Sequence, residues 1–101
     1  MSNAHYRISR KALSDLRSIW NYSLAKWSED QADKYYQLII QKIEFLSNHP
    51  ESGKEIDDIR AGYRSSKVKS HLIFYRLGND GVLEVIRILH QMMDIPNRLN
   101  D

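Results

Sequence analysis

The stretch from His71 to His90, HLIFYRLGNDGVLEVIRILH, decides the fold of this sequence. Two apolar runs of β-type residues, 71–77 and 82–90, flank the four residues Gly78-Asn79-Asp80-Gly81. Glycine and asparagine adopt the backbone angles that tight turns require, so this pattern predicts a β-hairpin. The first run is apolar at consecutive positions, which is typical of a central strand that is buried on both faces.

Upstream of this hairpin, the pattern predicts two more strands and two helices. Residues 63–68 form another β-type run, and residues 5–8 form a short one near the N-terminus. Apolar residues at helical spacing predict amphipathic helices over about 10–27 and from residue 28 to about residue 48. The predicted apolar face of the first helix consists of Ala12, Leu13, Leu16, Ile19, Trp20, Leu24 and Trp27.

Capping residues mark the ends of both predicted helices. Ser9 is a good N-cap for the first helix, and Ser28 with Gln31 forms a capping box for the second, which Pro50 ends. Because almost no loop separates the two helices, they must fold back on each other as an antiparallel hairpin.

The element order β-α-α-β-β-β predicts an α+β domain. We expect the helical hairpin to pack on one face of a small antiparallel sheet, and charged residues to gather on the other face, left partly open. After Asp94 we expect a short C-terminal tail or helix, frayed, with Pro96 at a helix start. The 101 residues suffice for a single domain, 1–101, and residues 1–4, which look tag-derived or disordered, are left out of this argument.

Composition excludes several classes of function. The sequence has no cysteine, so it can form neither disulfides nor thiolate sites. It has no apolar run near the ~20 residues that span a bilayer and no signal-peptide pattern, so we expect a cytoplasmic protein with no membrane partner. We expect no metal and no cofactor, because no His pairs with another ligand at metal-binding spacing and no Gly-rich phosphate loop is present.

The charges are unevenly distributed along the chain, although the net charge is only +2. Residues 59–79 carry five bases and no acid, whereas residues 28–58 are acidic overall. Such a block suits an anionic partner, either nucleic acid or an acidic protein segment. The plainer interpretation is a solvated strand face. The block consists of Arg60, Arg64, Lys67, Lys69 and Arg76.

Short motifs recur along these elements between Tyr6 and Asp94. They are Ala12-x-x-Asp15-Leu16-x-x-Ile19, Trp27, Gln31-Ala32, Tyr36, Leu46-x-x-x-Pro50-x-x-Gly53, Gly62-x-Arg64, His71-x-Ile73-x-Tyr75-Arg76 and Ile86-x-Ile88-Leu89-His90-x-x-Met93-Asp94. Each is weak alone, but in this order and spacing the chain resembles the ParE branch of the ParE/RelE superfamily of type II toxin–antitoxin systems.

The resemblance implies a plasmid-stabilisation type of toxin that a cognate ParD-like antitoxin neutralises. Such antitoxins have a DNA-binding domain and an extended segment that wraps the toxin, so the toxin contacts DNA only indirectly, through the antitoxin. The best-known target of the family is DNA gyrase. The resemblance therefore implies a gyrase inhibitor that acts by binding.

Two alternatives remain open. A RelE-like toxin would cut mRNA on the ribosome, which needs a base, an acid and cations around the scissile phosphate. Arg64, Lys67 and His90 are the catalytic candidates for that reaction, with Glu55 as a further acid, but no Tyr or Arg follows His90 as RelE-like enzymes would require. The second alternative is an inactive toxin-fold protein that acts only in the antitoxin complex and in promoter control.

For a binding toxin we expect no catalytic residues. An exposed sheet edge would accept an extended antitoxin strand, and an open apolar groove would accept an amphipathic helix. Charge reversal at Arg64 and Arg76 should then weaken antitoxin binding. His71, which begins an apolar strand, is interpreted as a hydrogen-bonded framework residue. The candidate antitoxin- or target-binding residues are Arg60, Arg64, Lys67, Lys69, Arg76, Arg87 and His90.

Overall fold

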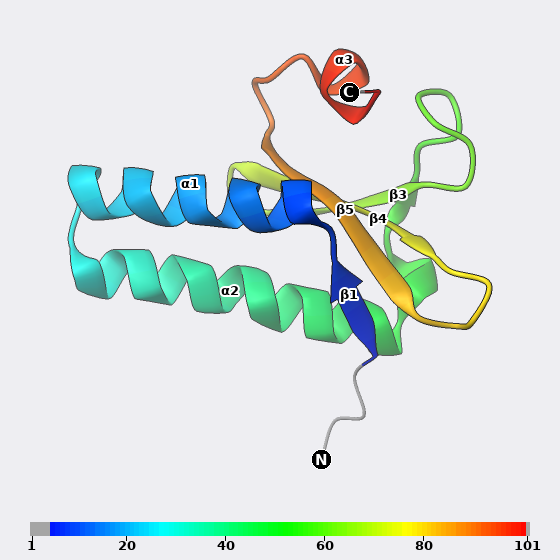
Figure 1. The fold of residues 1–101 in the computed structure, drawn as a ribbon, viewed down its shortest axis with the longest axis horizontal. Helices are drawn as coiled ribbons and strands as arrows, with labels where there is room; N and C mark the ends of the chain where they lie inside the picture. The colour runs from blue at the N-terminus through cyan, green and yellow to red at the C-terminus, as the bar shows by residue number, and fades with distance from the viewer. Residues whose placement is uncertain (1–4, 101) are drawn as a thin grey trace.

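The computed structural model describes residues 5–100 and confirms the α+β class (Figure 1). The predictions for residues 1–4 lie outside the described residues. The helical hairpin packs against a sheet, and a short third helix follows the last strand. The elements are β1 (Tyr6–Ile8), α1 (Arg10–Lys26), α2 (Glu29–Asn48), η1 (Pro50–Ser52), β2 (Lys54–Glu55), β3 (Arg64–Val68), β4 (His71–Leu77), β5 (Leu83–His90) and α3 (Ile95–Leu99).

Both helices of the hairpin begin at the predicted serine caps. The Ser9 hydroxyl accepts a hydrogen bond from the Ala12 amide at 3.0 Å, and the Ser28 hydroxyl accepts one from the Gln31 amide at 3.2 Å. Each bond satisfies one of the amides that a helix leaves unpaired in its first turn. The second helix ends before Pro50, as predicted.

The predicted apolar face of α1 is too wide. The buried positions of α1 are Ala12, Leu16 and Ser23, whereas Leu13 and Trp27 are 51% and 57% exposed. Leu24 is also exposed. A helix that lies between a sheet and one neighbouring helix buries only a narrow stripe, and the remaining apolar residues of α1 therefore face outward.

The sheet has the strand order β1-β5-β4-β3-β2 and is mixed, not antiparallel as predicted. β3, β4 and β5 pair antiparallel through the predicted hairpin, but β1 pairs parallel with β5, Tyr6 opposite Leu83. A parallel neighbour requires a long crossover connection, and here the helical hairpin and the later strands provide it. β2, two residues long, was not predicted because so short a strand leaves no pattern.

The free edge of β5 beyond β1 is completed by α1. Where β1 ends, the Ser9 amide donates to the Val85 carbonyl at 3.0 Å and the Ser9 hydroxyl donates to the Ile86 carbonyl at 2.8 Å. Further along α1, the Asp15 carboxylate accepts from the Ile88 amide at 3.0 Å. Polar groups of α1 thus take the place of a neighbouring strand.

A bulge in β5 changes which residues face the helices. Phe74 of β4 lies opposite Arg87, and Tyr75 lies opposite Val85, so Ile86 has no partner in the register. Val85 and Ile88 consequently both belong to the core beneath the helices. An extra residue of this kind shifts the alternation of side chains by one position.

The face of the sheet away from the hairpin carries a second apolar cluster, contrary to the prediction of an open charged face. Phe74 and Leu89 of the sheet are 1% exposed, and Leu99 of α3 covers them together with Ile56 and Tyr63 of the loop before β3. The C-terminal residues are therefore not a frayed tail. Figure 1 shows α3 lying over the sheet, apart from the hairpin.

The tyrosine of the sheet core, Tyr75, fixes the connection between α2 and β2. Its hydroxyl donates to the Pro50 carbonyl at 2.7 Å and accepts from the Gly53 amide at 2.9 Å. A Cβ atom on Gly53 would lie 2.1 Å from that hydroxyl oxygen. The glycine of the Pro50-x-x-Gly53 motif is thus required by close approach to a buried ring.

Replacement of Gly53 by alanine should therefore destabilise the fold. We expect Gly53→Ala to lower the free energy of unfolding by about 2 to 3 kcal/mol, because the methyl group overpacks a ring held at both ends. Urea denaturation measures the effect. Tyr75→Phe removes the nearest atom. The loss of unfolding free energy in the double variant should therefore be smaller than the sum of the losses in the two single variants. Strict additivity would show that the clash is absent.

Candidate functional site

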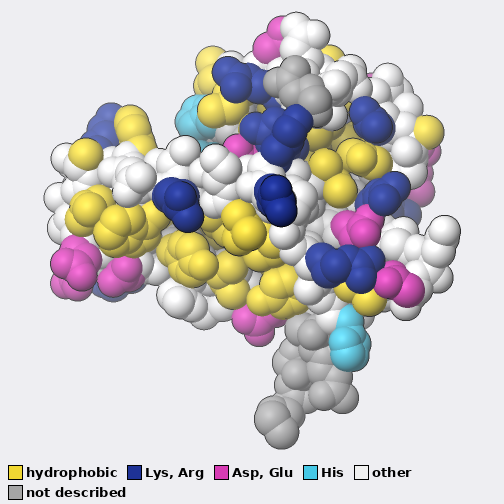
Figure 2. Space-filling model, viewed as in Figure 1, with side chains coloured by type: hydrophobic (Ala, Val, Ile, Leu, Met, Phe, Trp, Pro, Cys, Tyr) yellow, Lys and Arg dark blue, Asp and Glu magenta, His cyan; other side chains and the backbone are white. Residues whose placement is uncertain are grey.

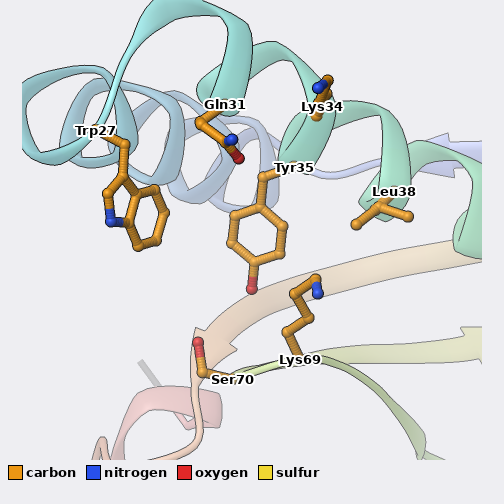
Figure 3. Close-up of a pocket in the computed structure, with 7 residues that line it drawn as sticks. All are labelled: Trp27, Gln31, Lys34, Tyr35, Leu38, Lys69 and Ser70. Atoms are coloured by element: carbon orange, nitrogen blue, oxygen red, sulfur yellow. The ribbon is translucent and has the colours of Figure 1, made fainter.

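The far part of the helical hairpin and the β3–β4 turn line a common groove. Two cavities of about 510 and 580 Å³ adjoin this turn and share Trp27, Tyr35 and Ser70 in their linings. We call their combined lining the tip groove. Figure 3 shows its first part, with Gln31, Tyr35 and Leu38 of α2 on one side and Lys69 and Ser70 of the turn on the other.

Tyr35, His71 and His90 form a polar chain along the tip groove. The Tyr35 hydroxyl lies 2.6 Å from Nδ1 of His71 and 3.2 Å from the Val68 carbonyl. The rings of His71 and His90 meet edge to face with centroids 5.2 Å apart. Burial, assisted by the nearby His90, lowers the pKa of His71 below its ordinary value. His71 is thus a hydrogen-bonded residue of the framework, as predicted.

A second groove follows the outer surface of the helical hairpin. Leu13, Leu16 and Trp20 of α1 face Tyr36 of α2 across a cavity of about 540 Å³. Apolar side chains form a band between the two helices on this face (Figure 2). The Trp20 indole donates to Asp33 at 3.0 Å, which ties the two helices together at the surface. We call this surface the outer groove; it shares no lining residue with the tip groove.

The predicted basic residues are used mainly within the fold. Arg64 donates to the Gly53 carbonyl at 2.8 Å and to Glu55 at 3.0 Å, so it holds the β2 connection. Arg76 pairs with Glu84 at 2.6 Å on the neighbouring strand. Charge reversal at either position would break these contacts as well as change the surface, which makes both sites poor probes of a partner.

Arg87 and Arg60 also have partners. Arg87 forms two bonds to the Asp15 carboxylate, 2.8 and 2.9 Å long, with side chains only 12% and 14% exposed. Arg60 donates to Asn100 at 3.0 Å and lies over the ring of Tyr63. These contacts fasten α1 and α3 to the sheet.

Lys67, Lys69 and His90 are the candidates that remain at the surface. Within residues 5–100, no hydrogen bond or ion pair holds the side-chain ammonium of Lys67 or Lys69. Lys69 and His90 line the two parts of the tip groove. Nδ1 of His90 accepts from the Met92 amide at 3.1 Å. The predicted basic block is therefore divided among several places.

The three catalytic candidates for RNA cleavage do not meet. Arg64 pairs with Tyr75 of the core beneath the helices, whereas Lys67 pairs with Leu72 of the second cluster, so their side chains leave opposite faces of the sheet. His90 lies opposite His71, four residues along β4 from Tyr75. That spacing separates His90 from Arg64 by about 13 Å along the strand direction. Glu55, the further acid, is paired with Arg64.

Across the described part of the chain, no group of three or more His, Asp or Glu residues is placed to hold a metal ion. The same residues include no helix whose length and apolar character would let it cross a membrane.

The sequence analysis did not identify the groove residues on α1, because it assigned them to the core. Leu13, Trp20 and Trp27 were counted with the buried stripe, yet they line grooves. A signal was present, because seven apolar positions cover more of a helix than one neighbour can bury. Lys69 also has a positive φ of 51°, which residue type alone did not reveal.

The chain matches a family of small toxins from type II toxin–antitoxin systems. The family described as the ParE toxin of type II toxin-antitoxin systems, parDE, matches residues 6–95. The chain belongs to this ParE toxin family.

Relatives support the assignment along nearly the full chain. Toxin ParE1 of Caulobacter vibrioides is 43% identical over 89 residues, 88% of this chain and 91% of that protein. Toxin ParE1 of Mycobacterium tuberculosis H37Rv is 35% identical over 97 residues, 96% of this chain and 99% of that protein. A solved chromosomal ParDE system from P. aeruginosa has the same fold, with a TM-score of 0.75 at 18% identity, covering 89% of this chain and 98% of that chain.

The environment of His71 predicts a pH dependence of stability. Since its pKa is lower in the folded state than the ordinary value of 6.5, the unfolded chain takes up the proton first as the pH falls. His71 should therefore contribute a loss of stability as the pH drops through about 6.5. We expect His71→Asn, whose side-chain amide can still form a hydrogen bond with the Tyr35 hydroxyl, to make the fall in unfolding free energy between pH 7.5 and 5.5 shallower.

Urea denaturation at several pH values measures this slope. The matched control is His5→Asn, at an exposed position, which should leave the slope of the parent protein unchanged. Equal slopes for the parent and His71→Asn would contradict the linkage.

Proposed function

We propose that this chain is a ParE toxin that inhibits DNA gyrase by binding it and that a cognate ParD-like antitoxin neutralises it in the cytoplasm. The observation that supports a binding mode most directly is the separation of Arg64, Lys67 and His90, which face different parts of the surface. RNA cleavage needs its base, acid and cation around one phosphate. The grooves of the molecule instead present apolar side chains, which suit protein partners.

The outer groove suits a helix of the antitoxin. It lies between two antiparallel helices, and apolar residues line it, among them the exposed Leu13 and Tyr36 and the half-buried Trp20. An amphipathic helix laid into such a groove buries apolar area along its whole length. The ParDE system of P. aeruginosa, whose toxin fold this chain shares, likewise pairs a toxin with an antitoxin.

The edge of the sheet at β3 suits an extended antitoxin segment. β2 pairs only with Arg64 and Ser65, so within residues 5–100 the outer edge of β3 from Ser66 to Val68 has no strand beside it. Lys67 lies in this segment and would attract an acidic strand. A segment added here would cover an edge that otherwise invites aggregation.

Two assays run in parallel test the mode of action. The purified toxin should inhibit supercoiling by DNA gyrase and leave ribosome-bound mRNA intact. Codon-specific mRNA cuts with unaffected gyrase would overturn the proposal in favour of a RelE-like enzyme. Absence of both effects, together with normal growth on expression, would favour an inactive protein that serves only in the antitoxin complex and promoter control.

A pair of matched leucine variants tests the outer groove. Leu13 and Leu77 are 51% and 53% exposed, but only Leu13 lines the groove. We expect Leu13→Glu to weaken antitoxin binding about tenfold or more, because it places a charge in an apolar interface, and Leu77→Glu to change it less than about twofold. Titration calorimetry with the purified antitoxin measures both. Equal effects would exclude the groove from the interface.

A further inference from the structure

We propose that the tip groove binds a segment of the toxin's target protein in which a large apolar side chain stands next to an acidic one. This inference rests on the proposed function, since it assigns the target-binding surface of a toxin that acts by binding. It concerns a surface distinct from the outer groove, because the two linings have no residue in common.

The aromatic wall of the tip groove supplies the apolar subsite. Trp27 is 57% exposed at the junction of the two helices, although nothing in the hairpin requires an indole there. Its ring borders both cavities, with Tyr35 of α2 next to it and Leu38 at the far side of the first cavity (Figure 3). Exposed tryptophans in concave sites are the residues that most often dominate the energy of a protein interface.

The lysines of the tip groove form the subsite for the acidic side chain of the partner. Lys34 of α2 and Lys69 of the β3–β4 turn line the same cavity as Trp27, and no carboxylate lines either cavity. The two lysines come from different elements and approach the cavity from opposite sides. A carboxylate between them would gain from both charges, which favours an acidic residue beside the apolar anchor.

The backbone of Lys69 indicates that this lysine serves more than the turn. Val68 and His71 pair across the strands, so Lys69 and Ser70 form a two-residue turn. Lys69 has a φ of 51°, in the region that glycine and asparagine adopt most easily. A glycine would form this turn with less strain, yet the chain places a long cation there, directed at the groove. Residues held in such strained conformations cluster at functional sites.

A protein segment fits the groove better than a nucleic acid does. A single-stranded nucleic acid needs a continuous basic track with stacking platforms. Here the two lysines stand at one end, and Glu29 and Asp30 begin α2 directly after the Trp27-Ser28 junction, where they would repel a phosphate backbone. The rest of the lining is largely apolar, including Ile19, Tyr22 and Met93.

Binding of variants to purified DNA gyrase and to the purified antitoxin tests the proposal. We expect Trp27→Ala and Lys69→Glu each to weaken gyrase binding about tenfold or more and to leave antitoxin binding within about twofold. The matched controls are Phe45→Ala and Lys42→Glu, which remove an exposed aromatic ring and reverse a partly exposed charge on α2 outside the groove. Both controls should bind gyrase as the parent protein does.

Lys69→Gly separates a functional role from a structural one. It removes the charge and relieves the backbone, so the melting temperature should rise while gyrase binding weakens. A lysine that served only the turn would give no loss of gyrase binding in this variant. Circular dichroism of every variant verifies that the fold is kept.

The remaining outcomes are decisive. Unchanged gyrase binding in all groove variants, or loss of antitoxin binding instead, would overturn the assignment. Binding of a twelve-nucleotide single-stranded oligonucleotide that is lost in Lys69→Glu would overturn it in favour of nucleic acid. If the parent protein arrests growth without binding gyrase, the proposed target is wrong, and the groove proposal holds only if Trp27→Ala and Lys69→Glu abolish the arrest. A parent protein that neither binds gyrase nor arrests growth overturns both proposals.

Discussion

The completion of β5 by α1 is the constraint on which the rest of the structure depends. β5 lies between β4 and a β1 of only three residues, so most of its outer edge would lack hydrogen-bond partners. Ser9 and Asp15 satisfy the carbonyls and the amide that β1 does not reach. Asp15 also neutralises Arg87, and removing one partner from a buried pair of this kind costs about 3 to 5 kcal/mol. The position of the first helix is therefore fixed by polar groups before apolar packing refines it.

The position of α1 explains why the grooves lie where they do. Because the helix begins at the sheet edge and runs for 17 residues, its last turns reach the level of the β3–β4 turn, where Trp27 borders a cavity rather than the core. The bulge at Ile86 assigns Val85 and Ile88 to the core beneath the helices, and Leu89 to the second cluster. The two faces of the sheet are thus both filled, one by the hairpin and the other by α3, and most of the exposed large apolar side chains among residues 5–100 lie on the helices and at the tip.

The sequence predicted the bounds of the helices and strands better than it predicted which strands lie next to each other in the sheet. Serine caps and the Gly-Asn-Asp-Gly turn act through local chemistry, so the helices and the β-hairpin appeared close to their predicted bounds. The parallel pairing of β1 with β5 joins residues more than 70 positions apart and has no local signature. The site was harder still to predict, because an arginine in an ion pair and an arginine free for a partner have the same pattern in sequence. Arg64 and Arg76 were candidates for that reason, and only their contacts with Glu55 and Glu84 distinguish them from Lys67 and Lys69.

The exposed apolar residues have a thermodynamic consequence for a protein of this size. Leu13, Trp27 and Tyr36 would each stabilise the fold if buried, yet the helical hairpin can bury only one stripe against the sheet. A partner that binds the folded chain alone stabilises it by mass action, in proportion to the logarithm of the partner's concentration. Apolar area that stays outside the core thus stabilises the complexes of the toxin and not the free toxin. On this argument, groove residues are retained for the partner they meet, and changes in them should affect binding more than folding.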